Sequence, residues 1–575
     1  MGVVAWTWLL TGASFALYLA VSVWARNRAT SHYYVAERPV SPVVQGMATA
    51  SDWISAASFM SMAGLIAFSG RDGSAYLMGW TGGYVLLAVL VAPYLRKYGK
   101  YTVPQFVGER YYSRRARVVA LLCAIAISFT YVTAQMRGVA LVLSRFLGIS
   151  VQAGVVCGMA VVLLYAMLGG LRGITATQVA QYLVTVIAFL IPAVLMSLAL
   201  TGQPVPALGF GSRLSQEGAA ALGVPPGQML LDAVNQMGTE LGFRPYTAGW
   251  RPRVDVLMIT LALMAGTAGL PHILIRFFTV PKIRDARATA GWALLFIAVL
   301  YTTAPALAAF TRASFVRAVH QTSHADAPEW LKAWESSGLL TWTDRNGDGR
   351  MQLSGRPEAN EVQVDQDILV LAAPEIARLP AWVVGFLAAA ALTAALSTAA
   401  GLLLVIASAI SHDLARSLWT PNLRPRNEVR LARLSMTAAV VAGGWVAAHP
   451  PGLVAQTVAL AFGFAASSFF PALVIGIFWK RANREGAIAG MLAGLGFTAA
   501  CVTWFKLLRP DLDTPAHWWL GISPEGIGAL GMALNFAVTA VVSLLTPPPP
   551  PEVQEMVASL RYPGSPARSP AGPPR

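Results

Sequence analysis

Charged residues are scarce in this chain: Asp, Glu, Lys and Arg make up 12% of its 575 residues, while 56% are hydrophobic. An ordinary soluble domain carries roughly 25% charged residues, which it needs to cover its surface. So little charge at this length excludes an ordinary cytosolic enzyme and a disordered chain. A helix needs about 20 apolar residues to cross the hydrocarbon core of a membrane. The composition therefore predicts a polytopic protein in a lipid bilayer.

Cysteine and acidic residues are also few. The three cysteines lie in apolar runs without a CxxC pair, which excludes a disulfide framework and favours small buried side chains. The excess of 42 basic over 27 acidic residues gives a net charge of +15. In a membrane protein such an excess reflects Lys and Arg at the cytoplasmic ends of spans, so we predict no nucleic-acid partner. The chain has no P-loop, HExxH or nucleophile elbow, and we predict that it is not an enzyme.

Long apolar segments are what the chain has in abundance, and by length they predict about 13 transmembrane helices. The segments are 4–24, 42–69, 74–95, 118–146, 150–171, 175–201, 254–280, 288–312, 380–410, 431–448, 453–479, 485–506 and 524–545. They make residues 1–545 an all-α membrane domain.

The basic residues orient these spans. They cluster after the first, third, seventh, ninth and eleventh spans, which would all lie on one side and therefore on the cytoplasmic side. We expect a bacterial inner-membrane protein with its N-terminus outside, its C-terminus in the cytoplasm and two long extracytoplasmic loops, 202–252 and 313–379. The Pro-rich end, 546–575, predicts a disordered cytoplasmic tail with one short helix around 552–560.

The second span contains a carboxylate, Asp52, among the small and hydroxylated residues of 46–58. A charge inside a span is costly and marks a functional site by default. Such a stretch predicts a discontinuous helix whose freed carbonyls can bind a cation. A tight helix–helix interface would also explain the small residues, but not the carboxylate.

The seventh span carries a second predicted break, at Gly266, Gly269 and Pro271, followed by His272. Proline lacks an N–H and glycine weakens a helix, so the two together interrupt it. His272 is either a packed, hydrogen-bonded residue or a proton carrier. Breaks at matching positions, five spans apart, predict a transporter built from inverted repeats, at about 40–201 and 254–479.

Two further spans offer ligand groups. In the ninth span Ser397 and Thr398 lie one turn after the Ala394 carbonyl, so three hard oxygens could face a small cation, unless the hydroxyls bond back to their own helix. In the fourth span Arg137 could grip a carboxylate in a bidentate fork, or snorkel outward or pair with another group.

The second long loop contains the sequence DRNGDGRMQ, which fits the first nine positions of an EF-hand calcium loop, with Gly349 at position six. The candidate ligands are Asp344, Asn346, Asp348 and Arg350. Position twelve is Gly355 instead of Glu, and Glu358 and Glu361 are the candidates to replace it. An Asx-rich turn is the alternative interpretation.

Four stretches together resemble the sodium:solute symporter family, and within it the cation/acetate (monocarboxylate) permease group. They are ASDWISAASF (50–59), AQM (134–136), GTAGLPHILIRFFTV (266–280) and SAISHDL (408–414), within a similarity from about residue 33 to 545. The resemblance implies a LeuT-like 5+5 inverted-repeat fold with extra helices at both ends. It also implies a sodium site formed by the backbone oxygens of Ala50, Trp53 and Ala394 and the hydroxyls of Ser397 and Thr398. Asp52 matches the family's essential intramembrane carboxylate.

The resulting hypothesis is sodium-coupled uptake of a small monocarboxylate such as acetate. The expected solute-binding residues are Ser55, Gln135, Arg137, Gly266, Thr267, Gly269 and His272. The 313–379 insertion and Arg137 depart from short-looped acetate permeases and leave the exact organic anion open. The alternatives are proton coupling through His272 or Asp52, and a symporter-like sensor, which would need a membrane partner protein.

Overall fold

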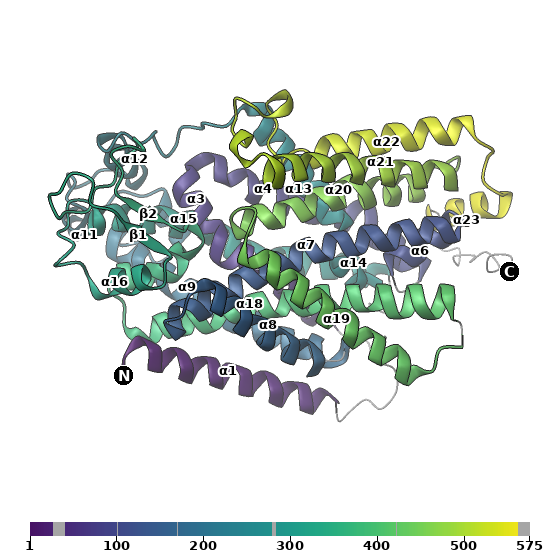
Figure 1. Cartoon of the computed structure of the whole chain (residues 1–575), viewed down its shortest axis with the longest axis horizontal. Coiled ribbons are helices and arrows are strands. Elements are labelled where there is room, and N and C mark those ends of the chain that lie inside the picture. The colour runs from purple at the N-terminus through teal and green to yellow at the C-terminus, as the bar shows by residue number, and fades with distance from the viewer. Residues whose placement is uncertain (27–40, 100–101, 169–170, 279–282, 421, 562–575) are drawn as a thin grey trace.

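The computed structural model describes residues 1–26, 41–99, 102–168, 171–278, 283–420 and 422–561. Long helices lie side by side along one direction (Figure 1). The helices at the predicted spans are α1 (Val3–Arg26), α2 (Pro42–Trp53), α3 (Met62–Ser69), α4 (Ser74–Leu86), α5 (Ala92–Tyr98), α7 (Arg114–Leu147), α8 (Val151–Leu168), α9 (Leu171–Thr201), α13 (Arg253–Gly269), α14 (Pro271–Phe278), α15 (Ile283–Val319), α18 (Ala381–Ser408), α19 (Pro425–Ala448), α20 (Val454–Phe478), α21 (Arg484–Thr503) and α22 (Gly528–Leu545).

Shorter elements connect these helices. They are α6 (Val103–Arg110), α10 (Pro206–Phe210), α11 (Gln216–Leu222), α12 (Leu230–Glu240), α16 (Glu329–Ser336), α17 (Leu369–Ile376), α23 (Pro551–Arg561), strands β1 (Leu340–Trp342) and β2 (Val362–Val364), the π-helical segments η1 (Ala57–Ser61), η3 (Leu87–Val91), η5 (Ala409–Trp419) and η6 (Trp504–Leu508), and the 3₁₀ turns η2 (Gly70–Gly73), η4 (Gln366–Ile368), η7 (Pro510–Leu512) and η8 (Trp519–Gly521). Local sequence explains many of the helix ends. Ser113, for example, caps α7 by accepting a hydrogen bond from the Ala116 N–H, and Gly148 ends it in a left-handed conformation.

Helices lie at every predicted span. By length and apolar composition, ten helices within the described residues can cross a membrane, and a bent pair makes up to eleven. This is fewer than the 13 expected, partly because 57–98 counts as one run of 42 residues. The described apolar part of α8, Val151–Leu164, is also too short to be counted.

Two helices form the centre of the molecule. In the spans that contain α18 and α20, 94% of the apolar window is buried, against 17% in α1, which lies at the periphery (Figure 1). Helix α18 packs against α7, α9 and α2, and α20 packs against α13 and α7. Of the cysteines, Cys123 and Cys501 are buried as expected, but Cys157 on α8 is exposed.

The two polar segments, 202–252 and 313–379, form what we call the loop domain. It contains α10–α12, α16, α17 and the antiparallel pair β1–β2, in which Leu340 pairs with Val364. In Figure 1 it lies at the left end, where the N-terminus also lies, while α23, the last described helix, lies at the right end. Both polar segments thus lie at the same end of the molecule as the N-terminus, and the side of a membrane to which this end belongs stays a prediction.

The predicted tail is folded over its first part. Helix α23 buries one apolar face, including Met556 and Val557, against α20 and α5. The Arg561 guanidinium donates to the Phe478 carbonyl at the end of α20 (3.3 Å). The short helix is therefore confirmed, and the prediction of disorder from residue 546 is wrong as far as 561, because this amphipathic face finds a surface to cover. Residues 562–575 lie outside the described part.

Candidate functional site

The first helix break is present where Asp52 predicted it. Helix α2 ends at Trp53, and Ile54 leaves the helical conformation with φ −72° and ψ 82°. The Trp53 carbonyl accepts from the Ser55 N–H (2.8 Å) and the Ser58 hydroxyl (3.3 Å) before η1 begins at Ala57. The backbone thus turns inside the protein with its polar groups partly satisfied by local hydrogen bonds.

The second break separates α13 from α14, which meet at an angle of 47°. Pro271 opens α14 and cannot donate to the preceding turn, which explains the interruption. The two glycines before it allow a close approach of α20. A Cβ on Gly266 would lie 2.3 Å from the Phe462 carbonyl oxygen, and one on Gly269 would lie 2.9 Å from that of Ala465. Both glycines therefore have a packing role.

The hydroxyls of α18 reach the first break. Ser397 donates to the carbonyl of Ser51 (3.0 Å), and Thr398 donates to that of Asp52 (2.8 Å). Both also contact the Ala394 carbonyl, at 3.0 and 3.3 Å, so the back-bonding alternative is present as well. Hydroxyl and carbonyl oxygens are the ligands that hard cations prefer.

The α2 carbonyls that the two hydroxyls contact, those of Ser51 and Asp52, are not the ones that were expected to bind sodium. Those expected to bind sodium, Ala50 and Trp53, accept from the N–H groups of Ile54 and Ser55, both at 2.8 Å. The hydroxyls contact the two carbonyls in between. The structure brings α18 and the broken α2 together as predicted, and the assignment of individual sodium ligands stays a prediction.

The Asp52 carboxylate lies in a buried triangle with two side chains that the sequence analysis missed. Arg276 on α14 donates from Nε to Asp52 Oδ2 (2.7 Å). Gln178 on α9 donates to Asp52 Oδ1, and its own amide oxygen accepts from Arg276 Nη2. All three side chains are at least 94% buried. Arg276 could have been identified from the sequence, because it is a charged residue in an apolar span, whereas no sequence pattern singles out Gln178.

Three of the expected solute-binding residues carry buried polar atoms without a hydrogen-bond partner among the described residues. These atoms are the Ser55 hydroxyl, Gln135 Nε2 and both ring nitrogens of His272. The Gln135 amide oxygen accepts from the Ala56 N–H (3.0 Å), which ties α7 to the first break. Buried polar groups are nearly always paired, so unpaired ones that gather at two breaks indicate a place for a polar ligand. Thr267, in contrast, bonds back to Leu263 (2.7 Å).

Aromatic rings connect these groups. The Tyr131 ring lies edge-on to His272, with centroids 5.4 Å apart, and Phe462 lies 5.9 Å from Tyr131 and 5.5 Å from Trp53. The region between the breaks is therefore apolar and aromatic, with a few polar atoms.

Arg137 does not join this region. Its guanidinium forms an ion pair with Asp365 of the loop domain (2.7 Å). Two turns further along α7, Arg145 pairs with Glu375 of the same domain (2.7 Å). Of the two interpretations of Arg137, the structure shows the pair with another group instead of a clamp on a solute carboxylate.

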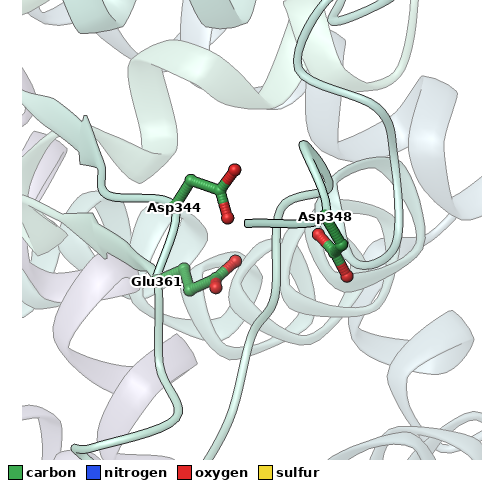
Figure 2. A group of neighbouring side chains, drawn as sticks. All are labelled: Asp344, Asp348 and Glu361. Carbon is green, nitrogen blue, oxygen red and sulfur yellow. The ribbon is translucent and has the colours of Figure 1, made fainter. Parts of the chain in front are cut away.

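The calcium-like loop brings three carboxylates together. The ligand oxygens of Asp344, Asp348 and Glu361 lie within 4.8 Å of one another. Figure 2 shows Asp344 and Glu361 side by side, with Asp348 across the loop. The Gly347 and Gly349 N–H groups donate to Asp344 (2.8 and 3.0 Å), as the Asx-turn alternative expects. Asn346 bonds to Asp348, whereas the Arg350 side chain turns away to the Gln321 carbonyl.

Comparisons with known proteins agree with this architecture. The family model described as "Sodium:solute symporter family" matches residues 33–327 and 359–494. An uncharacterized symporter of Cupriavidus necator is 35% identical over 95% of this chain and 92% of its own. A monocarboxylic acid transporter of Corynebacterium glutamicum is 28% identical over 81% of this chain and 77% of its own. The solved structure of a Na⁺-coupled sialic acid symporter covers 94% of this chain and 98% of its own, with a TM-score of 0.65 and 15% identity. This likeness shows the LeuT-like fold.

Proposed function

Because the chain belongs to the sodium:solute symporter family, we propose that it is a secondary active transporter that couples sodium entry to the uptake of a small monocarboxylate such as acetate. The observation that carries the proposal is the contact of the α18 hydroxyls with the broken α2, beside a buried carboxylate. The relative from Corynebacterium glutamicum and the structural neighbour are both transporters, which favours transport over catalysis.

Sodium would bind among the hard oxygens between α2 and α18. Ala394 and the two hydroxyls supply the α18 side, and the carbonyls of Ala50 to Trp53 supply the α2 side. The hydroxyls already face these carbonyls, and a cation there would accept their lone pairs in place of the present hydrogen bonds. A proton-coupled transporter would have no need for such a group of oxygens.

The solute would bind between the two breaks. Ser55, Gln135 and His272 offer polar atoms that have no partner in the described part of the chain, and the N-terminus of α14 adds a favourable field for an anion. Trp53, Tyr131 and Phe462 supply an apolar, aromatic surface for the carbon chain of the solute. The monocarboxylic acid transporter among the relatives supports this class of solute.

Alternating access would open the site toward each side in turn. We place the loop domain and the N-terminus outside, and α23 in the cytoplasm, of a bacterial inner membrane. Next to the second break, a small recess is lined by residues that include Pro271, Ile275, Ser408 and Asp413. In our proposal the path toward the cytoplasm would begin at this recess.

The test is uptake of labelled acetate by proteoliposomes with an inward sodium gradient, and with potassium in its place. We expect accumulation only with sodium, and its loss in Ser397→Ala plus Thr398→Ala. Thr302→Ala, which removes an exposed hydroxyl bonded to its own helix, is the control and should transport normally. Sodium-blind uptake that an uncoupler abolishes would favour the proton-coupled alternative and overturn the sodium site.

We propose in addition that the loop at 344–350 binds calcium, with Glu361, which directly precedes β2, in place of the missing twelfth-position carboxylate. The ligand spacing and the converging carboxylates support this. Calorimetric titration of the purified protein with Ca²⁺ should show binding that Asp348→Asn weakens at least tenfold. Asp326→Asn, in the same domain, should leave binding unchanged. An absence of heat in the unaltered protein would refute the site.

A further inference from the structure

The buried triangle of Asp52, Arg276 and Gln178 contains one negative and one positive charge. The carboxylate receives hydrogen bonds from Arg276 and Gln178, and both oxygens are used. The carboxylate also lies against α18, since a Cβ on Gly401 would lie 3.5 Å from Asp52 Oδ1. Gly401 follows Thr398 by one turn, so this neutralised carboxylate lies directly beside the predicted sodium oxygens.

A net charge in the interior of a membrane protein is costly. An unpaired Asp52 would attract sodium and hold it without any solute. With Arg276 on the same carboxylate, the triangle has no net charge to offer. Sodium alone would then leave the site with one positive charge, and a monocarboxylate alone would leave one negative charge. Only the two together restore neutrality.

We propose that Arg276 is a positioning residue that cancels the charge of Asp52, so that sodium and the anionic solute must neutralise each other. This inference rests on the proposed function and goes beyond it in two respects. It makes transport electroneutral, with one sodium ion for each monocarboxylate. It also predicts selection for monoanions, because a dianion with one sodium ion would leave a net charge.

Substitution of Arg276 and substitution of Asp52 should have opposite effects on ligand binding. Arg276→Gln leaves Asp52 uncompensated, so sodium should bind without solute and more tightly, while acetate should bind more weakly. Asp52→Asn leaves Arg276 uncompensated, so acetate binding should depend less on sodium. A unit charge acting over about 10 Å at an effective dielectric constant of about 20 changes an affinity by roughly tenfold. The double variant restores a neutral site and should regain sodium-dependent acetate binding.

The experiment measures charge movement on solid-supported membranes together with labelled acetate uptake. The unaltered protein and Arg276→Lys should take up acetate without net current. Arg276→Gln should carry a sodium current without acetate, which a purely structural role of Arg276 would not produce. Arg145→Gln removes one member of another buried ion pair, which joins α7 to the loop domain, and should transport without current. If Arg276→Gln does not fold, the double variant is measured instead, because it contains no uncompensated buried charge.

The outcomes separate the inference from the proposed function. If the unaltered protein shows no sodium-dependent acetate uptake, the proposed function fails. If it takes up acetate with sodium but carries net current, the charge-cancelling role of Arg276 is wrong. The role is also wrong if Arg276→Gln folds and keeps electroneutral transport. If Arg276→Gln does not fold, the role is wrong if the double variant shows no recovery of sodium-dependent acetate binding over Asp52→Asn.

Discussion

Gly266→Ala should separate α13 from α20 and impair transport. The added Cβ would lie 2.3 Å from the Phe462 carbonyl oxygen and 2.8 Å from its carbonyl carbon, whereas real Cβ atoms essentially never approach closer than 3.0 Å. The helices must therefore move apart by at least about 0.7 Å, and the obstacle is backbone that cannot rotate away. Overpacking of this kind costs about 1–3 kcal/mol, and a rigid obstacle places the cost near 3.

The shift occurs within one turn of the second break, so we expect slower uptake as well as lower stability. Thermal unfolding in detergent and the proteoliposome uptake assay measure the two effects. Gly496→Ala is the matched control, because it is also a helical glycine but has nothing within 4 Å of the added Cβ. It should keep full transport and gain slightly in stability. If Gly266→Ala were as stable and as active as this control, the packing argument would be refuted.

Three further predictions concern the loop domain and the tail. Burial and the neighbouring charge of Asp365 raise the pKa of Asp367 to about 7. Docking of Asp367 onto the Val454 N–H should therefore be strongest below pH 4 and weaken as the pH rises to 7, and hydrogen exchange at α20 should lose this dependence in Asp367→Asn. Arg137→Ala should lower the free energy of unfolding by about 1 kcal/mol, because the pair is partly solvated, and should leave the affinity for acetate unchanged. Met556→Ala should destabilise the docked α23 by about 2 kcal/mol and speed its proteolysis.

The sequence was most informative where structure depends on local composition. Apolar length located the helices, and Gly and Pro located both breaks, since each effect acts within a few residues. The pair of hydroxyls at 397 and 398 was found for the same reason. The short tail helix was predicted from its own pattern, but its docking surface on α20 was not.

The sequence did not predict which residues far apart along the chain contact each other. Arg276 was visible as a charge in a span, but its partner Asp52 lies 224 residues away. Arg137 pairs with a residue 228 positions away, in a loop whose docking no local pattern indicates. The packing role of Gly266 likewise depends on α20, which only the tertiary fold places beside it. Local patterns thus found the candidate residues, and the fold decided which of them meet.

Asp52 joins the two predicted repeats through both its backbone and its side chain. Its backbone carbonyl accepts from Thr398, and its carboxylate holds Arg276; both partners belong to the second repeat, 254–479, whereas Asp52 and Gln178 belong to the first. Alternating access in this kind of fold moves one repeat or bundle against the other around a fixed site. Any such motion that shifts α14 or α18 against α2 must therefore stretch contacts of Asp52. Because the same contacts border the predicted sodium oxygens, occupancy of that site and the movement of the repeats cannot be independent.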